Sequence, residues 1–307
     1  MPVPSLRLIV LLICLLGSAA PAAHGQQMAD PQFDSRVENP AYTKNFPRVL
    51  FDEAHNNVDN THGRYKPFAD LLFNDGYHLT VNRQPFTKAV LASVKILVIV
   101  NPLGGEDVDE EGSDSAAFTT PEIEALSEWV KGGGALLFVV DAGPFASSAE
   151  GLATSLGVEM SKSEVPSASA EDKQVGSAGA VVYSRSNHSL SEHSIMNGRS
   201  ETERVNRVIV FGGQALKGPS GSEPLLKLVE PSEKKVPESG KPDPSAGRSQ
   251  AIVFRLGKGR VVMLGDAAML SAQVGGADDK PFGMNLPGID NRQLTLNIMH
   301  WLSGILK

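Results

Sequence analysis

Four short apolar runs, each ending on an aspartate or an asparagine, constrain the fold of this chain most strongly. The runs occupy residues 48–52, 95–101, 135–141 and 260–266 and end at Asp52, Asn101, Asp141 and Asp266. They are rich in Val, Ile and Leu without polar alternation, which is typical of strands buried on both faces of a parallel sheet. Ligands of open α/β sheets bind outside the carboxyl ends of the strands. The four polar residues are therefore predicted to share the edge where a site would form.

Helical patterns separate these runs. Apolar residues at helical spacing predict a helix that stops at Gly76, and Thr119 with Glu122 forms a capping box that begins another helix. Residues 250–256 and 259–264 predict a hairpin, and a last helix is expected from about Asn291. The alternation predicts an α/β fold with a largely parallel sheet and an antiparallel C-terminal addition.

One domain accounts for most of the chain. A polar lead-in, residues 26–46, precedes a single α/β domain expected over residues 47–307. Three polar stretches within it, near residues 104–117, 161–178 and 231–248, are expected to be flexible surface insertions.

The first 25 residues have the pattern of a cleaved signal peptide. A weakly basic start precedes an apolar core and small residues that end at Gly25, after which cleavage is expected. An uncleaved anchor is the alternative, although the apolar core is shorter than the roughly 20 residues of a membrane span. No later segment is long and apolar enough to span a bilayer. We expect a periplasmic or secreted protein that has lost Cys14, its only cysteine, and with it any thiolate ligand or nucleophile.

Charge argues against nucleic acid as a partner. The net charge is −7, from 28 Lys and Arg against 35 Asp and Glu, and no basic cluster is present.

The first candidate cluster follows the run that ends at Asp52. It contains Asp52, Glu53, His55, Asn56, Asp59 and His62. A carboxylate and an imidazole two or three residues apart could bind a metal or share a proton. The alternative is that Asp52 and Asn56 hydrogen-bond the turn and cap the next helix.

Later candidates are Asp266, Asn285 and Asn291, with Asp290 beside the last. For Asp266, Asp290 and Asn291, helix capping is the alternative to ligand binding. The stretch from Asp107 begins like a calcium loop, but Phe118 stands where that loop needs a bidentate glutamate. No metal and no cofactor is predicted.

Asp141 stands at a strand-to-helix turn where several hydrolases of α/β fold carry a nucleophile. The turn reads Asp-Ala-Gly-Pro-Phe, and no Gly-x-Ser-x-Gly occurs in the chain. Nucleophilic acyl transfer at this turn is therefore not expected.

Five segments carry a family resemblance: residues 49–56, 97–102, 122–134, 257–266 and 291–302. They resemble the class I glutamine amidotransferase-like superfamily. Within it they are similar to a bacterial family of unknown function that is related to the amino-terminal domain of an intraflagellar transport component and to gliding-motility transporter accessory proteins.

The resemblance implies a three-layer, flavodoxin-like sandwich with its functional edge at the strand ends. A working amidotransferase would carry a cysteine at the nucleophile turn and a histidine with a glutamate late in the chain. Here the turn has Asp141 and no His-x-Glu follows, so glutamine hydrolysis is not expected. A related branch, similar to trehalose-utilisation proteins, implies sugars as ligands.

Three functional hypotheses follow. The first is an exported, non-catalytic amidotransferase-like domain that binds a small ligand or a protein partner at the edge holding Asp52, His55, Asn101, Asp141 and Asp266. The second is a metal-assisted or acid/base hydrolase of saccharides that uses Asp52, Glu53, His55 and Asp266. The third is a structural domain that binds an envelope protein in a periplasmic transport assembly.

Overall fold

The computed structural model describes residues 27–165, 180–228, 248–275 and 280–307. The predicted signal peptide lies outside the described residues, as do residues 231–247 of the third predicted insertion. Within the described ranges, no helix is long and apolar enough to cross a membrane.

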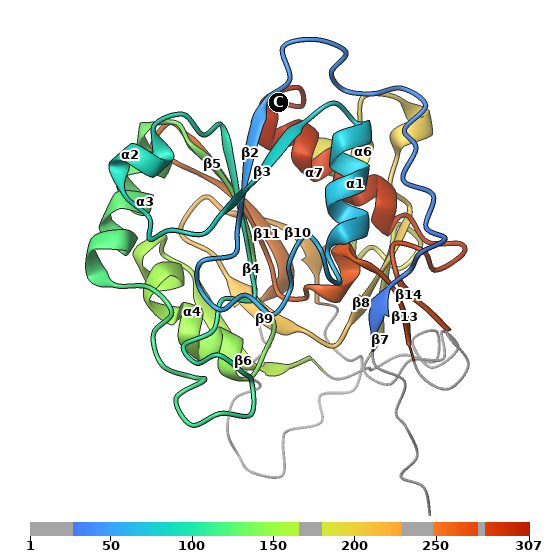
Figure 1. The fold of residues 1–307 in the computed structure, drawn as a ribbon. Helices are drawn as coiled ribbons and strands as arrows, with labels where there is room; N and C mark the ends of the chain where they lie inside the picture. Colours follow the sequence, from blue (N-terminus) through green and yellow to red (C-terminus); the bar gives the residue numbers. More distant parts are fainter. Residues whose placement is uncertain (1–26, 166–179, 229–247, 276–279) are drawn as a thin grey trace, which may run out of the picture.

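A nine-stranded mixed sheet forms the centre of the molecule (Figure 1). One half of it consists of five parallel strands, in the spatial order β3 (His78–Asn82), β2 (Arg48–Asp52), β4 (Ile96–Val100), β5 (Ala135–Val139) and β12 (Gly259–Leu264). The other half is joined by antiparallel pairings and contains β11 (Ser249–Leu256), β9 (Gln214–Lys217), β6 (Glu159–Glu164) and, beside β11, β10 (Glu223–Lys227). The predicted α/β class, with a largely parallel sheet and an antiparallel addition, is confirmed.

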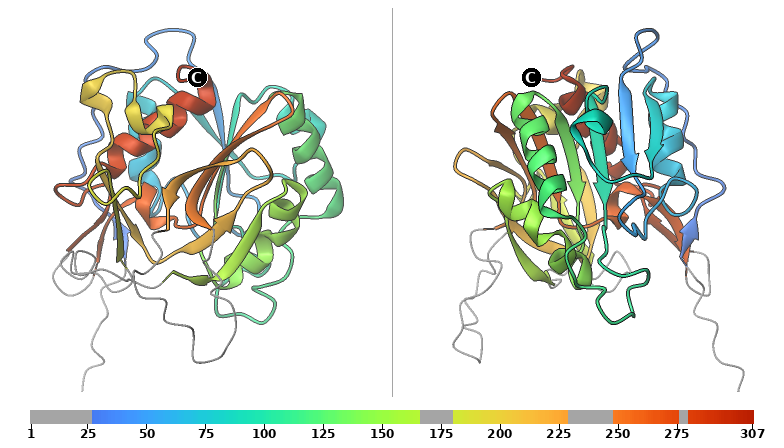
Figure 2. Two further views of the ribbon diagram at one scale, coloured as in Figure 1. Left: turned by 180° about the vertical axis from the view of Figure 1, so that it is seen from behind. Right: turned by 60° about the vertical axis from the view of Figure 1, so that its left-hand side comes forward.

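Helices cover both faces of the sheet, which completes the three layers (Figure 2). On one face lie α1 (Lys66–Asn74) and α7 (Asn291–Ser303), and on the other lie α2 (Lys88–Leu91), α3 (Thr120–Gly132) and α4 (Pro144–Ser155). Successive residues of a strand point to opposite faces. Ile96 and Val98 of β4 therefore pack toward α1 and α7, whereas Leu97 and Ile99 pack toward α3 and α4.

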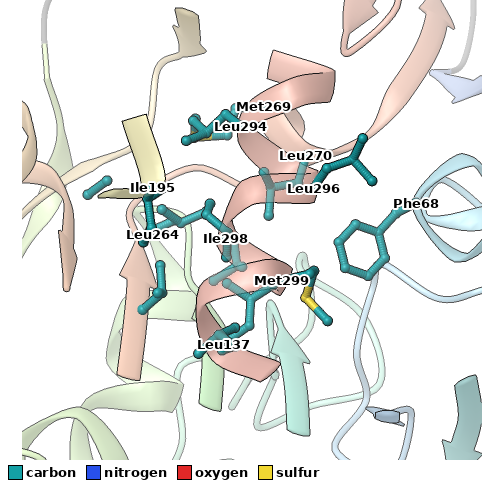
Figure 3. Packing of buried hydrophobic residues seen from close by; sticks show 14 of the residues in the cluster. Phe68, Leu137, Ile195, Leu264, Met269, Leu270, Leu294, Leu296, Ile298 and Met299 are labelled. Carbon is teal, nitrogen blue, oxygen red and sulfur yellow. The ribbon is translucent and has the colours of Figure 1, made fainter. Parts of the chain in front are cut away.

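Helix α7 anchors one of the two apolar layers. Its Leu294 and Ile298 are fully buried in the same cluster as Leu137 of β5 and Leu264 of β12, and Phe68 of α1 joins that cluster (Figure 3). Each fully buried aliphatic side chain contributes about 1.5–3 kcal/mol. This packing holds the parallel strands in place, and with them the residues at their carboxyl ends.

Smaller elements flank the strand ends. One three-stranded sheet consists of β1 (Met28–Ala29), β13 (Ala272–Gly275) and β14 (Lys280–Gly283), and β7 (Ala180–Ser184) pairs with β8 (Arg207–Phe211). The short helices are α6 (Ser194–Asn197), η1 (Glu201–Glu203) and η2 (Ala268–Leu270).

The boundary of one predicted insertion was wrong. The loop expected from residue 161 begins later, because residues 161–164 belong to β6, and Glu164 pairs with Gln214 of β9 after an irregularity in the register. Hydrogen bonding to β9 overrides a composition that is polar and poor in apolar residues. Residues 166–178 of that insertion lie outside the described part of the chain.

Candidate functional site

The four polar residues that end the apolar runs follow four neighbouring strands. Their strands lie in the order β2, β4, β5 and β12, so Asp52, Asn101, Asp141 and Asp266 come at one edge of the sheet. Asn101 and Asp141 are in direct contact. The Asn101 side chain donates from Nδ2 to Oδ2 of Asp141 at 2.8 Å, and its Oδ1 accepts from the Asp141 backbone N–H at 2.9 Å.

Asn101 also connects this edge to the loop after β2. Its Nδ2 donates to Oδ2 of Asp59 at 2.9 Å. The residue has φ of 41°, a left-handed conformation that asparagine tolerates better than most residues. One buried amide thus holds two carboxylates together.

Backbone N–H groups bind the other oxygen of Asp141 and both oxygens of Asp266. Oδ1 of Asp141 accepts from the N–H of Ala267 at 2.6 Å. The two oxygens of Asp266 accept from the N–H groups of Phe211 and Ala268, at 2.8 and 3.1 Å. The capping alternative for Asp266 is therefore correct in part, because Ala268 begins η2, but the same carboxylate also ties β8 to the strand edge.

Burial and mutual repulsion raise the pKa values of the carboxyl groups at this edge. Burial, with the charge of Asp266 next in importance, raises the pKa of Asp141 to about 8. Burial likewise raises the pKa of Asp266 to about 6 and raises that of Asp59. Two carboxylates that interact this strongly titrate as a pair. Near neutral pH the pair therefore retains a proton.

A cleft of about 540 Å³ opens beside these carboxylates. Its described lining is Gln27, Asp59, Arg64, residues 141–145, residues 162–164, Phe211, Gly213, residues 266–268, Gln273 and Phe282. The turn from β5 to α4 forms one wall, where Gly143 has φ of 68° and ψ of −139°, a conformation essentially restricted to glycine. Asp141 therefore occupies a sharp strand-to-helix turn that lines the cavity.

His55 is part of a separate buried cluster, named here the His55 cluster: His55, Asp52, Glu122, Phe86 and Phe118. The imidazole contacts Oδ2 of Asp52 through Nδ1 at 2.8 Å and Oε1 of Glu122 through Nε2 at 2.9 Å. The Phe86 and Phe118 rings pack on it, with centroids 4.9 and 4.6 Å away. Because both nitrogens face acceptors, the ring is doubly protonated when the carboxylates are ionised.

The pKa values of His55 and Glu122 favour a protonated imidazole beside an ionised carboxylate. Burial lowers the pKa of His55, but hydrogen bonds and charges from Asp52 and Glu122 outweigh burial and raise it. Burial would raise the pKa of Glu122, but hydrogen bonds from Thr119 and His55 outweigh burial and lower it to about 2. The cluster joins β2 to the start of α3 and is 7% exposed or less at His55, Asp52 and Glu122.

The other predicted site residues lie outside the cleft lining. The Glu53 carboxylate binds Thr61 and Arg83, and Asn56 is exposed with φ of 48°. Asn285 donates to Asp30 and to the carbonyl of Gln273. Of the four groups assigned to a hydrolase, Asp266 alone is in the described lining, since Asp52 and His55 belong to the His55 cluster.

Three capping expectations were wrong. Helix α1 begins only at Lys66 with Tyr65 at its N-cap, so neither Asp52 nor Asn56 caps it. The other half of that alternative holds for Asp52, whose Oδ1 accepts from the N–H of Ala54 in the turn at 3.3 Å. Asp290 precedes α7 but makes no side-chain cap and accepts instead from the N–H groups of Asn206 and Arg207. Asn291 donates to the carbonyls of Ile209 and Met269 and is fully buried. For Asp290 and Asn291, hydrogen bonds to backbone groups in and beside β8 take the place of capping.

Sequence reasoning missed six polar residues of the cleft: Gln27, Arg64, Lys162, Ser163, Glu164 and Gln273. None of them belongs to a recognisable motif, and Gln273 comes from β13, a four-residue strand. Among the described residues, no group of three or more His, Cys, Asp or Glu side chains is arranged to hold a metal ion. The metal-assisted form of the hydrolase hypothesis thus has no ligand set in the described part of the chain.

Neither a protein-family model nor a curated protein matches this sequence. Among solved structures, the mmIFT52 N-terminal domain matches with a TM-score of 0.55 and 15% identity, over 84% of this chain and 97% of that one. A GMP synthase-like protein of Thermoplasma acidophilum gives 0.46 and 11%, over 85% and 96%. A ThuA-like protein of Bacteroides uniformis gives 0.44 and 13%, over 89% and 95%.

The chain thus shares the fold of the mmIFT52 N-terminal domain. The expected likeness to the amino-terminal domain of an intraflagellar transport component is confirmed at the level of the fold, and membership of the amidotransferase-like superfamily stays a prediction. At such low identity the likeness concerns the fold alone, so what this edge of the sheet does has to be argued from the residues there.

Proposed function

We propose that this protein is an exported, non-catalytic amidotransferase-like domain that binds a small ligand in the cleft beside Asp141. The supporting observation is the turn between β5 and α4. Where an amidotransferase would carry its cysteine, this chain carries Asp141, hydrogen-bonded to Asn101 and to the backbone at Ala267. The turn thus opens on a cavity but offers a carboxylate in place of a nucleophile. We further propose that the chain belongs to the bacterial family that its sequence resembles.

Export rests on the sequence of residues 1–25. If they act as a signal peptide, N-terminal sequencing of the protein from the envelope of its host should begin at Gln26.

A ligand screen tests the binding proposal. Small saccharides, organic amines and organic acids are added to the full mature chain, and binding is followed by chemical-shift changes and by the unfolding temperature. We expect at least one class to bind in the micromolar to millimolar range and to lose at least tenfold in affinity in Asp141→Asn.

The matched control is Asp107→Asn, which removes the same charge from an exposed position in the loop 104–117. Binding should be unchanged in this variant. Failure of every class to bind, or equal binding to Asp141→Asn and to the unsubstituted protein, would overturn the proposal.

The pKa separation between Asp141 and Asp266 favours a second candidate, acid/base hydrolysis of a saccharide. The pair titrates with apparent pKa values of about 6 and 8, so between those pH values one of its two carboxyl groups would hold the proton to be donated and the other would serve as base or nucleophile. Nitrophenyl glycosides should then be cleaved with a bell-shaped pH profile over this window, and Asp141→Asn should lower turnover by about 10²–10⁴-fold. If the protein releases nitrophenol from none of these glycosides faster than buffer alone does, the hydrolase hypothesis is wrong.

A further inference from the structure

The described lining of the cleft carries an excess of negative charge. It includes four carboxyl groups, those of Asp59, Asp141, Glu164 and Asp266, against the two cations Arg64 and Lys162. Even with one proton held by the pair of Asp141 and Asp266, the carboxylates outnumber the cations. Lys162 is already paired through Nζ with Glu150 at 2.7 Å. The cleft is therefore better suited to a cationic group than to an anion.

Acceptor groups also outnumber donors at the buried end. Asn101 supplies its amide donor to both Asp59 and Asp141, and the Ala267 N–H binds the other oxygen of Asp141. The repulsion among these carboxylates raises the pKa of Asp141 further than burial alone would. A bound cation would relieve the same repulsion that a bound proton relieves in the free cleft.

A second observation, independent of the acids, comes from Gln273. This residue lines the cleft and is 3% exposed. Its Nε2 donates to Oγ of Ser271 at 2.6 Å, but its Oε1 has no hydrogen-bond partner among the described residues. An unsatisfied buried acceptor costs about 1–3 kcal/mol. A ligand whose donor reaches this oxygen would remove that cost.

Aromatic rings give the cleft an apolar side. Phe145, Phe211 and Phe282 line it, and the rings of Phe211 and Phe282 have centroids 4.1 Å apart. Ring faces attract ammonium groups and also cover hydrocarbon. The volume of about 540 Å³ falls within the size range of pockets for small organic molecules.

We propose that the cleft binds an organic ammonium ion, with its charged group at Asp141 and Asp266, its hydrocarbon against Phe211 and Phe282, and Gln273 as an additional acceptor. This assignment rests on the proposed ligand-binding function and names the chemical class of the ligand.

Proton release should accompany binding. The charged and titratable groups around Asp141 are Asp59, Arg64, Tyr65, Lys162, Glu164 and Asp266. Because the pKa of Asp141 is about 8 in the free cleft, a cation that binds below pH 8 must displace its proton. Affinity should therefore rise between pH 6 and pH 8, by up to about tenfold per pH unit for one linked proton, and level off above pH 8.

Calorimetric titration of the full mature chain with three molecules of matched shape tests the proposal: phenethylamine, 2-phenylethanol and phenylacetate. At pH 8 we expect the amine to bind at least tenfold more tightly than the other two. Titrations at pH 7 in buffers of different ionisation enthalpy should show that close to one proton is released for each amine bound.

Two variants distinguish the contribution of the Asp141 carboxylate from that of the Gln273 amide oxygen. Asp141→Asn should lower the affinity for phenethylamine at least tenfold and remove its dependence on pH. Gln273→Leu should lower that affinity several-fold and leave the pH dependence unchanged. Asp107→Asn should change neither. If Asp141→Asn does not fold, the weaker binding expected for Gln273→Leu and the pH dependence expected for the unsubstituted protein still test the assignment.

Tighter binding of the alcohol or of phenylacetate, or an amine affinity that is constant from pH 6 to 8, would overturn the assignment. If either of those two molecules then binds, and Asp141→Asn weakens its binding, the proposal that the cleft binds a small ligand would still be supported. If nothing in the wider screen binds, both proposals fail.

Discussion

Replacing Asp75 by alanine is expected to lower the free energy of unfolding by about 3–5 kcal/mol, the usual cost of removing one partner of a buried pair. Asp75 follows the last residue of α1, and its Oδ2 contacts Nε2 of His300 in α7 at 2.8 Å. The two side chains are at most 1% exposed. Its Oδ1 also accepts from the N–H of Ala41 at 2.7 Å. Urea unfolding followed by circular dichroism measures the loss.

The cost should be large because nothing nearby replaces the carboxylate. The other ring nitrogen of His300, Nδ1, has no hydrogen-bond partner among the described residues, so Asp75→Ala would leave the whole imidazole buried without one. Alanine would also free the Ala41 N–H and loosen the lead-in segment from α1.

Asp70→Ala is the matched control on the same helix. Asp70 pairs with Lys66 at the surface, with both side chains about half exposed, and exposed pairs contribute about 0–1 kcal/mol. A loss below about 1 kcal/mol for Asp75→Ala, similar to that of the control, would contradict the buried-pair interpretation.

The sheet could be predicted from the sequence because its signals are local. A run such as Leu97–Val100 has apolar side chains on both faces, so only a position between two helical layers can bury it. The acid or amide that ends each run follows from the same pattern. The sequence pattern alone therefore places Asn101, Asp141 and Asp266 at one edge, without any knowledge of the contacts among them.

Contacts between distant segments could not be predicted in this way. The capping box of Thr119 and Glu122 has a local signature and is confirmed, with Oε2 of Glu122 accepting from the Thr119 N–H and hydroxyl. The other oxygen of Glu122 binds His55, 67 residues away, and no spacing rule indicates such a contact. The same holds for Gln273 in the cleft and for Asp75 with His300, 225 residues apart.

His55→Ala is the second substitution for which we expect a large effect, a loss of about 3–5 kcal/mol at pH 6. The variant would leave the carboxylates of Asp52 and Glu122 buried without the imidazolium between them. It would also open a space between Phe86 and Phe118, which both pack on the ring. Chemical unfolding at a series of pH values measures the loss.

His62→Ala is the control, since it removes the same side chain from an exposed position in the same loop. Surface substitutions of this kind usually change stability by less than about 0.5 kcal/mol. A similar small effect for His55→Ala would show that the cluster contributes little.

The pH dependence distinguishes an ionic cluster from simple packing. The pKa of His55 is raised in the folded protein, so its stabilisation is complete below the ordinary value of 6.5 and is lost as the pH rises through the raised value. The pKa of Glu122 falls from 4.5 to about 2, so its stabilisation is complete above pH 4.5 and is lost as the pH falls toward 2. Both contributions are complete together only between about pH 4.5 and 6.5.

The cost of His55→Ala should therefore be largest in that interval and should shrink on either side of it. On the alkaline side the native imidazole becomes neutral and can donate to only one of its two carboxylates, so less is lost when it is removed. Packing against Phe86 and Phe118 is indifferent to pH, and it sets the cost that remains at pH 9. A cost that stays constant from pH 5 to pH 9 would mean that the rings, and not the charges, hold β2 to the start of α3.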